Sequence, residues 1–224
     1  MANVSLMPPS FAAAIFDFDG TLALTDGLWC TVDELFFARR GIPYDAEIAR
    51  ALSTRGFAEG AEWCIERYGL DETPEAICAE WTETSIELYK RDVHLRDGAE
   101  DYLRYLREQG IPLALATIND RTILASMERV DIFSLFDVVV CGQEGGRSKA
   151  HPDIFYKAAC ELGVGPAGTI VFEDTPDAIA TAAAAGFSTC ALAVPGSLHQ
   201  GFETLRSTAD VALESWGELY TQRA

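Results

Sequence analysis

Short apolar segments that alternate with helical segments constrain the fold of this chain more than any other feature. After residue 94, four apolar runs have the length of buried strands and are bounded by Gly, Pro or charged residues: 111–117, 137–141, 169–173 and 188–194. Apolar residues recur at helical spacing in 98–109, 120–130, 152–162 and 176–185. Together with a first strand that ends at Phe16, this order predicts a doubly wound α/β fold, in which helices cover both faces of a mostly parallel sheet.

Residues 24–93 interrupt the alternation because they carry helical patterns only. The patterns span 26–39, 45–52, 57–68 and 74–91. In the last of them, an apolar stripe of the kind that a helix buries is formed by Ile77, Trp81, Thr84 and Leu88. A crossover connection needs far fewer residues, so we expect a small all-helical cap inserted after the first strand. The predicted domains are a core of residues 1–23 and 94–224 and a cap of residues 24–93.

Composition excludes several classes of partner. The chain has 224 residues, 49% of them hydrophobic, and a formal net charge of −18, which would repel the phosphates of nucleic acids and of anionic membranes. Its six cysteines lack the spacing of a zinc site, and we expect them to be reduced in a cytoplasmic protein. No signal peptide or membrane span is predicted, since Asp17 and Asp19 interrupt the N-terminal apolar stretch. No feature of the sequence specifies an oligomeric state.

Polar residues follow the predicted strands at the points where these strands end. In an open parallel sheet the ligand site lies beyond the carboxyl ends of the strands, where the strand order reverses. We therefore expect the polar residues from separate segments to converge on one edge of the sheet. These residues are Asp17, Asp19, Gly20, Thr117, Asn119, Lys149, Glu173 and Asp174.

Several carboxylates at one edge need a compensating charge. Two carboxylates 4 Å apart repel each other by about 4 kcal/mol at an effective dielectric constant near 20. A hard divalent cation relieves this repulsion, and a few oxygen ligands suit Mg²⁺, with water and a substrate phosphate in the other positions. The Lys149 ammonium and the Thr117 hydroxyl would then contact phosphate oxygens. The sequence therefore predicts a site for phosphoryl transfer.

Four motifs in this order resemble those of the haloacid dehalogenase superfamily of phosphatases, in the subfamily that has a helical cap after the first motif. They are "DFDGTL" at 17–22, Thr117 in "LATIND", Lys149 in "SKAHPDIF" and "VFEDT" at 171–175. The resemblance covers nearly the whole chain, which is similar to members of the β-phosphoglucomutase and phosphoglycolate phosphatase type. It agrees with the doubly wound core and the inserted cap.

The resemblance implies a two-step hydrolysis. Asp17 would attack phosphorus and form an aspartyl-phosphate, while Asp19 would protonate the leaving oxygen and then activate water. Mg²⁺ would be held by the carboxylates of Asp17 and Asp174 and by the backbone carbonyl of Asp19, with Glu173 as a ligand, through water, or as a support for the other ligands. Substrate would further contact Gly20, Asn119 and, in the cap, Arg55, for which a surface ion pair is an equal alternative.

The expected function is hydrolysis of a small phosphorylated metabolite, similar to a sugar phosphate. One alternative is a hexose phosphate mutase similar to β-phosphoglucomutase, but such mutases usually carry a histidine near the start of the cap. This cap has no histidine, and Trp29 occupies roughly that place. Another alternative is a non-enzymatic signalling domain of the response-regulator type, whose phosphorylated aspartate would follow the third strand. Here that strand ends in Cys141 and Gly142.

Overall fold

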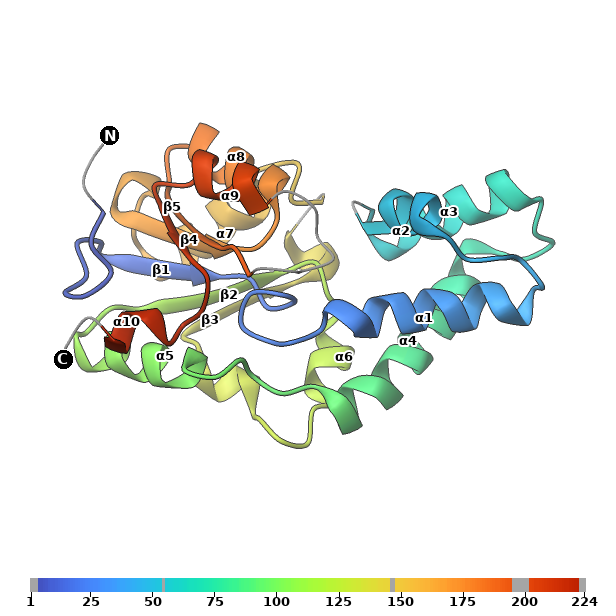
Figure 1. Cartoon of the computed structure of the whole chain (residues 1–224), viewed down its shortest axis with the longest axis horizontal. Coiled ribbons are helices and arrows are strands. Elements are labelled where there is room, and N and C mark those ends of the chain that lie inside the picture. Colours follow the sequence, from blue (N-terminus) through green and yellow to red (C-terminus); the bar gives the residue numbers. More distant parts are fainter. Residues whose placement is uncertain (1–3, 54, 146–147, 195–201, 222–224) are drawn as a thin grey trace.

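A six-stranded parallel sheet forms the centre of the larger part of the molecule (Figure 1). The computed structural model describes residues 4–53, 55–145, 148–194 and 202–221. The strand order is β3-β2-β1-β4-β5-β6, and every neighbouring pair is parallel. The strands are β1 (Ala13–Phe16), β2 (Leu113–Thr117), β3 (Val138–Cys141), β4 (Thr169–Glu173), β5 (Ser188–Leu192) and β6 (Val211–Leu213). The doubly wound α/β fold predicted from the sequence is confirmed.

Helices cover both faces of the sheet, and side chains alternate between the two faces along each strand. Phe16 of β1 and Phe172 of β4 stack at a centroid distance of 4.4 Å on one face, whereas Ile15 and Val171 point to the other. The first face is covered by α5 (Ala99–Glu108), α6 (Arg121–Ala125) and α10 (Glu218–Thr221). The second is covered by α7 (Asp153–Leu162), α8 (Pro176–Ala184) and α9 (Phe202–Thr208). Short 3₁₀ turns lie at Ile132–Leu135, Gly142–Gly145 and Pro166–Gly168.

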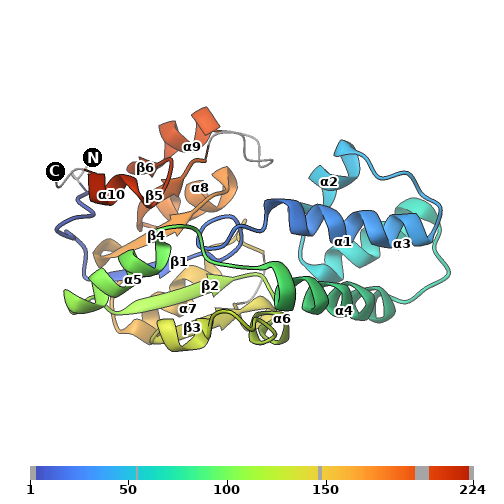
Figure 2. The same ribbon diagram turned by 60° about the horizontal axis from the view of Figure 1, so that its bottom comes forward.

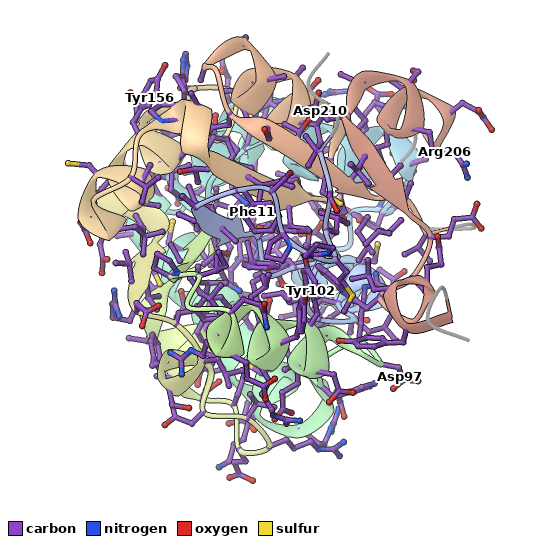
Figure 3. The ribbon with its side chains drawn as sticks, turned by 90° about the vertical axis from the view of Figure 1, so that its left-hand side faces the viewer. Phe11, Asp97, Tyr102, Tyr156, Arg206 and Asp210 are labelled. Atoms are coloured by element: carbon purple, nitrogen blue, oxygen red, sulfur yellow. The ribbon has the colours of Figure 1, made fainter. Side chains whose placement is uncertain are left out.

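Aromatic side chains fill the first face. Tyr102 of α5 lies between the sheet and the C-terminal segment, with its ring 5.7 Å from that of Phe172 and 5.5 Å from that of Trp216. Phe11, just before β1, packs edge-on against Phe172 from the end of the sheet opposite the cap. In Figure 3, Phe11 and Tyr102 lie in the interior, and Tyr156 and Arg206 lie at the periphery. Aromatic side chains therefore pack closely along this face of the sheet.

Four helices after β1 form the cap and stand to one side of the sheet (Figure 2). They are α1 (Asp26–Arg39), α2 (Ala46–Ser53), α3 (Phe57–Tyr68) and α4 (Pro74–Asp92). The cap has its own apolar centre, which includes Phe36, Ile77 and Trp81. As the sequence predicts, Thr73 caps α4 by accepting a hydrogen bond from the Ala76 amide at 3.3 Å, with Pro74 in the first turn.

The structure differs from the sequence prediction in four elements outside the cap. Helix α6 ends at Ala125 instead of continuing to residue 130, because the Ser126 hydroxyl donates to the Ile123 carbonyl at 2.6 Å and the chain turns there. The C-terminal strand β6 and helices α9 and α10 were not predicted, since three to seven residues are too few to establish a period.

No described helix has the length and apolar character to cross a membrane.

Candidate active site

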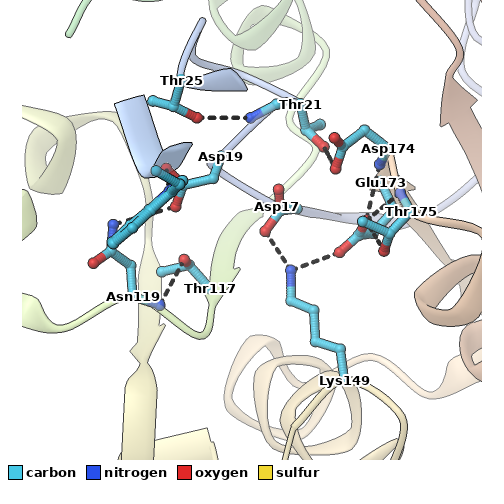
Figure 4. Close-up of polar contacts among 12 residues, drawn as sticks. Asp17, Asp19, Thr21, Thr25, Thr117, Asn119, Lys149, Glu173, Asp174 and Thr175 are labelled. Atoms are coloured by element: carbon cyan, nitrogen blue, oxygen red, sulfur yellow. Dashed lines mark hydrogen bonds and ion pairs between the residues drawn. The ribbon is translucent and has the colours of Figure 1, made fainter. Parts of the chain in front are cut away.

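The candidate site lies where the strand order reverses, at the carboxyl ends of the adjacent strands β1 and β4. From β1 the chain proceeds outward through β2 to β3, and then returns to β4 on the other side of β1. The Asp17 amide continues the ladder by donating to the Phe172 carbonyl at 2.9 Å. This pairing brings residues 17 and 174, which are far apart in the sequence, to the same edge of the sheet (Figure 4).

Lys149 lies between two buried carboxylates. Its ammonium forms ion pairs with Asp17 and, at 2.7 Å, with Glu173, and its side chain is only 10% exposed. Burial opposes the charge on Lys149, but the two carboxylates outweigh this effect and raise its pKa above the usual value. Burial likewise raises the pKa of Asp17 to about 7 against the attraction of Lys149. Lys149 therefore lies within direct reach of anything bound at Asp17.

Glu173 holds a network of hydrogen bonds at the start of α8. Its Oε2 accepts from the amides of Asp174 and Thr175, at 2.8 and 2.9 Å, and from the Thr175 hydroxyl at 2.9 Å, while Oε1 accepts from Lys149. Burial works against the charge, but the pair with Lys149 and these donors bring the pKa of Glu173 below its usual value. A carboxylate offers about four acceptor positions, so the capacity of Glu173 is used within the protein.

Asp17, Glu173 and Asp174 form an acidic triad that can bind a metal ion. Each offers a carboxylate oxygen within 4.8 Å of the other two, and all three side chains are buried. The donor set consists of oxygen atoms alone, which fits a hard divalent cation. Lys149 supplies one positive charge for the three carboxylates, and a cation would compensate the rest.

Gly20 permits the close approach of the loop after β1 to Asp174. Its φ is +80°, a left-handed conformation that favours glycine, and a Cβ atom at this position would lie 2.1 Å from Asp174 Oδ2. The next residue, Thr21, donates its hydroxyl to Asp174 Oδ1 at 3.4 Å. The "DGT" of the first motif therefore packs directly on the carboxylate that follows β4.

Asp19 faces away from Asp17 and is surrounded by uncharged donors. Trp29 Nε1 and the Tyr89 hydroxyl both donate to Oδ1, the former at 3.1 Å, and Asn119 Nδ2 donates to Oδ2 at 3.2 Å. Asn119 also donates to the Tyr89 hydroxyl at 2.7 Å. Burial raises the pKa of Asp19, and these hydrogen bonds oppose the increase. Trp29 and Tyr89 belong to the cap helices α1 and α4, so the cap takes part in the site.

Thr117 ends β2 inside the site and is completely buried. Its hydroxyl oxygen accepts a hydrogen bond from the Asn119 amide at 3.1 Å, which fixes the turn that brings Asn119 to Asp19. Asn119 itself is 4% exposed. Both residues therefore lie at the edge of the sheet that the sequence predicts, on the Asp19 side.

Arg55 lies in the cap, and its hydrogen bond and its cation–π contact with described residues are both within the cap. It donates to the Ala51 carbonyl, and its guanidinium lies 5.7 Å from the centre of the Trp63 ring. The structure therefore brings together the sequence-predicted site residues of the core, whereas the contacts of Arg55 do not join it to them.

Tyr89 was missed by the sequence analysis, and the error has a simple origin. The buried stripe of α4 consists of Ile77, Trp81, Ser85 and Tyr89, at intervals of four residues. The predicted stripe was wrong from its third member onward: Thr84 and Leu88 are only partly buried. An interval of four repeated over the whole helix would have identified Tyr89 as inward-facing. No pattern in the sequence connects it to Asp19.

Comparison with known proteins agrees with this arrangement. The family model of haloacid dehalogenase-like hydrolases matches residues 11–186. The chain is 31% identical over 214 residues to a probable pseudouridine-5'-phosphatase of Drosophila melanogaster, covering 91% of this chain and 92% of that protein. It is 27% identical over 198 residues to the phosphorylated carbohydrates phosphatase of Thermotoga maritima, with coverage of 88% and 91%.

A solved structure shares the whole architecture. CbbY from Rhodobacter sphaeroides, crystallised in complex with phosphate, is 28% identical to this chain and gives a TM-score of 0.79 over 93% of this chain and 96% of that one. The resemblance inferred from the four motifs is thus confirmed by the family model, by the relatives and by the fold. This chain belongs to the haloacid dehalogenase-like hydrolases.

Proposed function

We propose that the protein is a Mg²⁺-dependent phosphatase that hydrolyses a small, sugar-phosphate-like metabolite through an aspartyl-phosphate on Asp17. One observation carries the proposal. Asp17 directly follows β1 and lies beside the buried ammonium of Lys149, within the acidic triad at the point where the strand order reverses. A nucleophilic carboxylate, a fixed cation and a candidate metal site in one place are what phosphoryl transfer requires.

In the proposed first step, an oxygen of Asp17 attacks phosphorus and the bond to the leaving oxygen breaks. Lys149 and the Thr117 hydroxyl bind the phosphoryl oxygens and stabilise the negative charge that develops on them. Gly20 and Asn119 line the same edge and border the bound substrate. Arg55 stays a candidate for a second anionic contact from the cap, which would require it to leave the Ala51 carbonyl.

Asp19 is the proposed acid and base. It would give a proton to the leaving oxygen, and would then take one from the water that attacks the aspartyl-phosphate. The environments of the two aspartates support this division of roles. Asp17 lies next to the charged side chains of Lys149 and Glu173. Asp19 accepts hydrogen bonds from the uncharged side chains of Trp29, Tyr89 and Asn119.

The acidic triad fits Mg²⁺ by its donor chemistry. Asp17 and Asp174 would hold the ion together with the Asp19 backbone carbonyl. Glu173 would support these ligands, because Lys149, Asp174 and Thr175 already occupy its oxygens. When bound, the ion supplies a positive charge that polarises the phosphoryl group and neutralises the crowded carboxylates.

The mutase alternative is weakened by Trp29. The mutases that this chain resembles usually carry a histidine near the start of the cap, and an imidazole can both donate and accept a proton, whereas the indole N–H of Trp29 at roughly that place is a donor only. Hydrolysis is also the activity named for the probable pseudouridine-5'-phosphatase and the phosphorylated carbohydrates phosphatase that resemble this chain. The signalling alternative would place the phosphorylated aspartate after β3, whereas that strand is followed by Gly142.

We further propose that the protein acts in the cytoplasm, without nucleic acid as a partner. All six cysteines are free, as is usual in a reducing compartment, and the net charge of −18 disfavours polyanions.

Release of inorganic phosphate from a panel of sugar, nucleoside and polyol phosphates tests the proposed function, with Mg²⁺ present and after its removal by a chelator. We expect Mg²⁺-dependent release from at least one class, and free phosphate rather than an isomer from β-glucose 1-phosphate. Isomerisation would favour the mutase. A stable phosphoprotein without turnover would favour the signalling domain.

A further inference from the structure

Two side chains from distant parts of the sequence donate hydrogen bonds to backbone carbonyls of the loop after β1. Arg96 donates from Nε to the Gly20 carbonyl at 2.8 Å. Trp216 donates from Nε1 to the Thr21 carbonyl at 3.1 Å and is 1% exposed. Both acceptors follow Asp19 directly, so the two donors fix the peptide groups of the first motif. Neither donor belongs to any of the four motifs.

Gly20 and Thr21, whose carbonyls accept these two hydrogen bonds, also lie against the carboxylate of Asp174. The Cα of Gly20 lies so near the carboxylate that an added Cβ would be 2.1 Å from Oδ2. The Thr21 hydroxyl donates to Oδ1 at 3.4 Å, as Figure 4 shows. Two short chains of contacts therefore lead to the same carboxylate. One runs from Arg96 through Gly20, and the other from Trp216 through Thr21.

The two donors also line an open pocket at the surface. It has a volume of about 260 Å³ and is lined by Leu24, Leu95 and Val194 as well as by Arg96 and Trp216. Gly20 and Thr21 are buried and do not line this pocket. The two hydrogen bonds therefore connect buried carbonyls next to the acidic triad with side chains that border solvent-accessible space.

We propose that Arg96 and Trp216 are positioning residues that set the place of the Asp174 carboxylate and thereby the affinity of the site for a divalent cation. The inference rests on the proposed function in one respect, the use of the acidic triad as a metal site. Groups that orient metal ligands from outside the coordination shell commonly change metal affinity 10- to 100-fold, roughly, when they are removed. Arg96 and Trp216 act one step further out, so the lower end of that range applies.

Two substitutions remove the donors and keep the bulk of the side chains. Trp216→Phe retains a ring against Tyr102, and Arg96→Met retains an unbranched stem. The affinity of the full-length protein for Mn²⁺ is measured by calorimetric titration, with thermal unfolding of the same samples. We expect each variant to bind Mn²⁺ about 10-fold more weakly than the wild type while it stays folded. Arg96→Lys, which restores a donor, should recover part of the affinity.

Trp81→Phe is the matched control. It also removes a buried indole N–H, one that has no acceptor among the described residues, and it should bind Mn²⁺ as the wild type does. Lower thermal stability with unchanged Mn²⁺ affinity in Trp216→Phe and Arg96→Met would show that the two residues only support the fold, and would overturn the inference. Asp174→Asn separates the remaining cases. If it weakens Mn²⁺ binding and the two variants do not, the inference alone fails. If it also binds as the wild type does, the metal assignment fails with it.

Discussion

Asp17 and Asp19 are two residues apart, yet different parts of the molecule surround them. The core surrounds Asp17 with charges: the Lys149 ammonium and the carboxylates of Glu173 and Asp174. The cap surrounds Asp19 with two uncharged hydrogen-bond donors, Trp29 and Tyr89. Asn119 of the core is a third uncharged donor to the same carboxylate. The same side chain thus meets a charged environment on one side of the site and a neutral one on the other.

The difference separates the two tasks of a phosphoryl transfer site. Charge is useful where the phosphoryl group is bound and attacked, and the core can provide it in fixed positions because strand ends are rigid. Proton transfer to a leaving oxygen depends on the orientation of one carboxyl group, and Asp19, the proposed acid, is held by side chains of the cap helices α1 and α4. The predictions below test this division.

Asp17→Asn gives the largest expected effect. An amide cannot replace the attacking carboxylate, so phosphate release should fall by more than about 10⁴-fold, as for other catalytic nucleophiles. Incubation with a ³²P-labelled substrate followed by acid quenching should trap a phosphoprotein in the wild type and none in the variant. Asp33→Asn, which changes a carboxylate inside the cap, is the matched control and should keep its activity. Residual activity within 10-fold of the wild type would exclude Asp17 as the nucleophile.

Lys149→Met tests the charges on the Asp17 side. Removal of one partner from a buried ion pair leaves uncompensated charge, so the free energy of unfolding without metal should fall by about 3–5 kcal/mol. Because a bound cation supplies some of the missing charge, Mg²⁺ should restore more stability in the variant than it adds to the wild type. Urea unfolding with and without Mg²⁺ measures both effects.

Lys157→Met is the control for that experiment. Lys157 donates to the Glu144 carbonyl at 2.6 Å on the surface, and its loss should change stability by less than about 0.5 kcal/mol. Similar losses in the two variants would mean that Lys149 has no special role in compensating the acidic triad.

Tyr89→Phe tests the neutral side of the site. The variant keeps the ring and loses a hydrogen bond to Asp19, so proton transfer to the leaving oxygen should suffer most when the leaving group is basic. We expect kcat/KM to fall about 10-fold for benzyl phosphate and less than about 2-fold for p-nitrophenyl phosphate, whose leaving group departs without a proton. Trp29→Phe should act in the same direction.

The control for Tyr89→Phe is Tyr44→Phe, which also deletes a cap hydroxyl that donates to a carboxylate, in this case Asp33 at 3.2 Å. It should change kcat/KM for the two substrates equally little. An equal loss with both substrates in Tyr89→Phe would indicate general disturbance of the site instead of a role in holding the acid.

The two sides of the site also differ in how far the sequence predicts them. Each charged residue of the core side ends a strand, directly follows one or lies in a loop next to one, and the ends of parallel strands meet by geometry. Asp17, Lys149, Glu173 and Asp174 could therefore be placed together before the structure was known. The same reasoning predicted five of the six strands and missed only β6, which has three residues.

Contacts of the cap depend on how helices pack, which a motif does not encode. Tyr89 lies 70 residues from Asp19, and its contact depends on the face that α4 turns toward the core. The predicted stripe had the wrong phase in the second half of that helix, so Leu88 and not Tyr89 was expected to face inward. The sequence places Trp29 near the start of the cap, but its hydrogen bond to Asp19 depends on the bend of the chain between β1 and α1. Arg96 and Trp216 lie outside every motif and act through backbone carbonyls, which leave no trace in residue types.

Asp33→Asn gives the smallest expected effect and compares buried acids in the two parts of the molecule. Glu173 in the core is paired with Lys149, and its pKa is lowered, whereas burial raises the pKa of Asp33 to about 7 and the hydrogen bond from the Tyr44 hydroxyl opposes this increase. When the cap unfolds, the pKa of Asp33 returns toward 3.8. Between these values the folded protein holds a proton that the unfolded chain lacks, so the contribution of Asp33 to stability falls as the pH rises from about 4 to about 7.

Asparagine removes this titration and still accepts from Tyr44. The variant should therefore gain stability relative to the wild type at pH 8 but not at pH 4, by roughly 1 to 2 kcal/mol once the partial exposure of Asp33 is allowed for. Thermal unfolding of both proteins at pH 4, 6 and 8 measures the difference. A constant difference across this range would mean that Asp33 titrates alike in the folded and unfolded states. A buried acid in the cap would then be as well compensated as those of the core, and the contrast between the two parts would be confined to the active site.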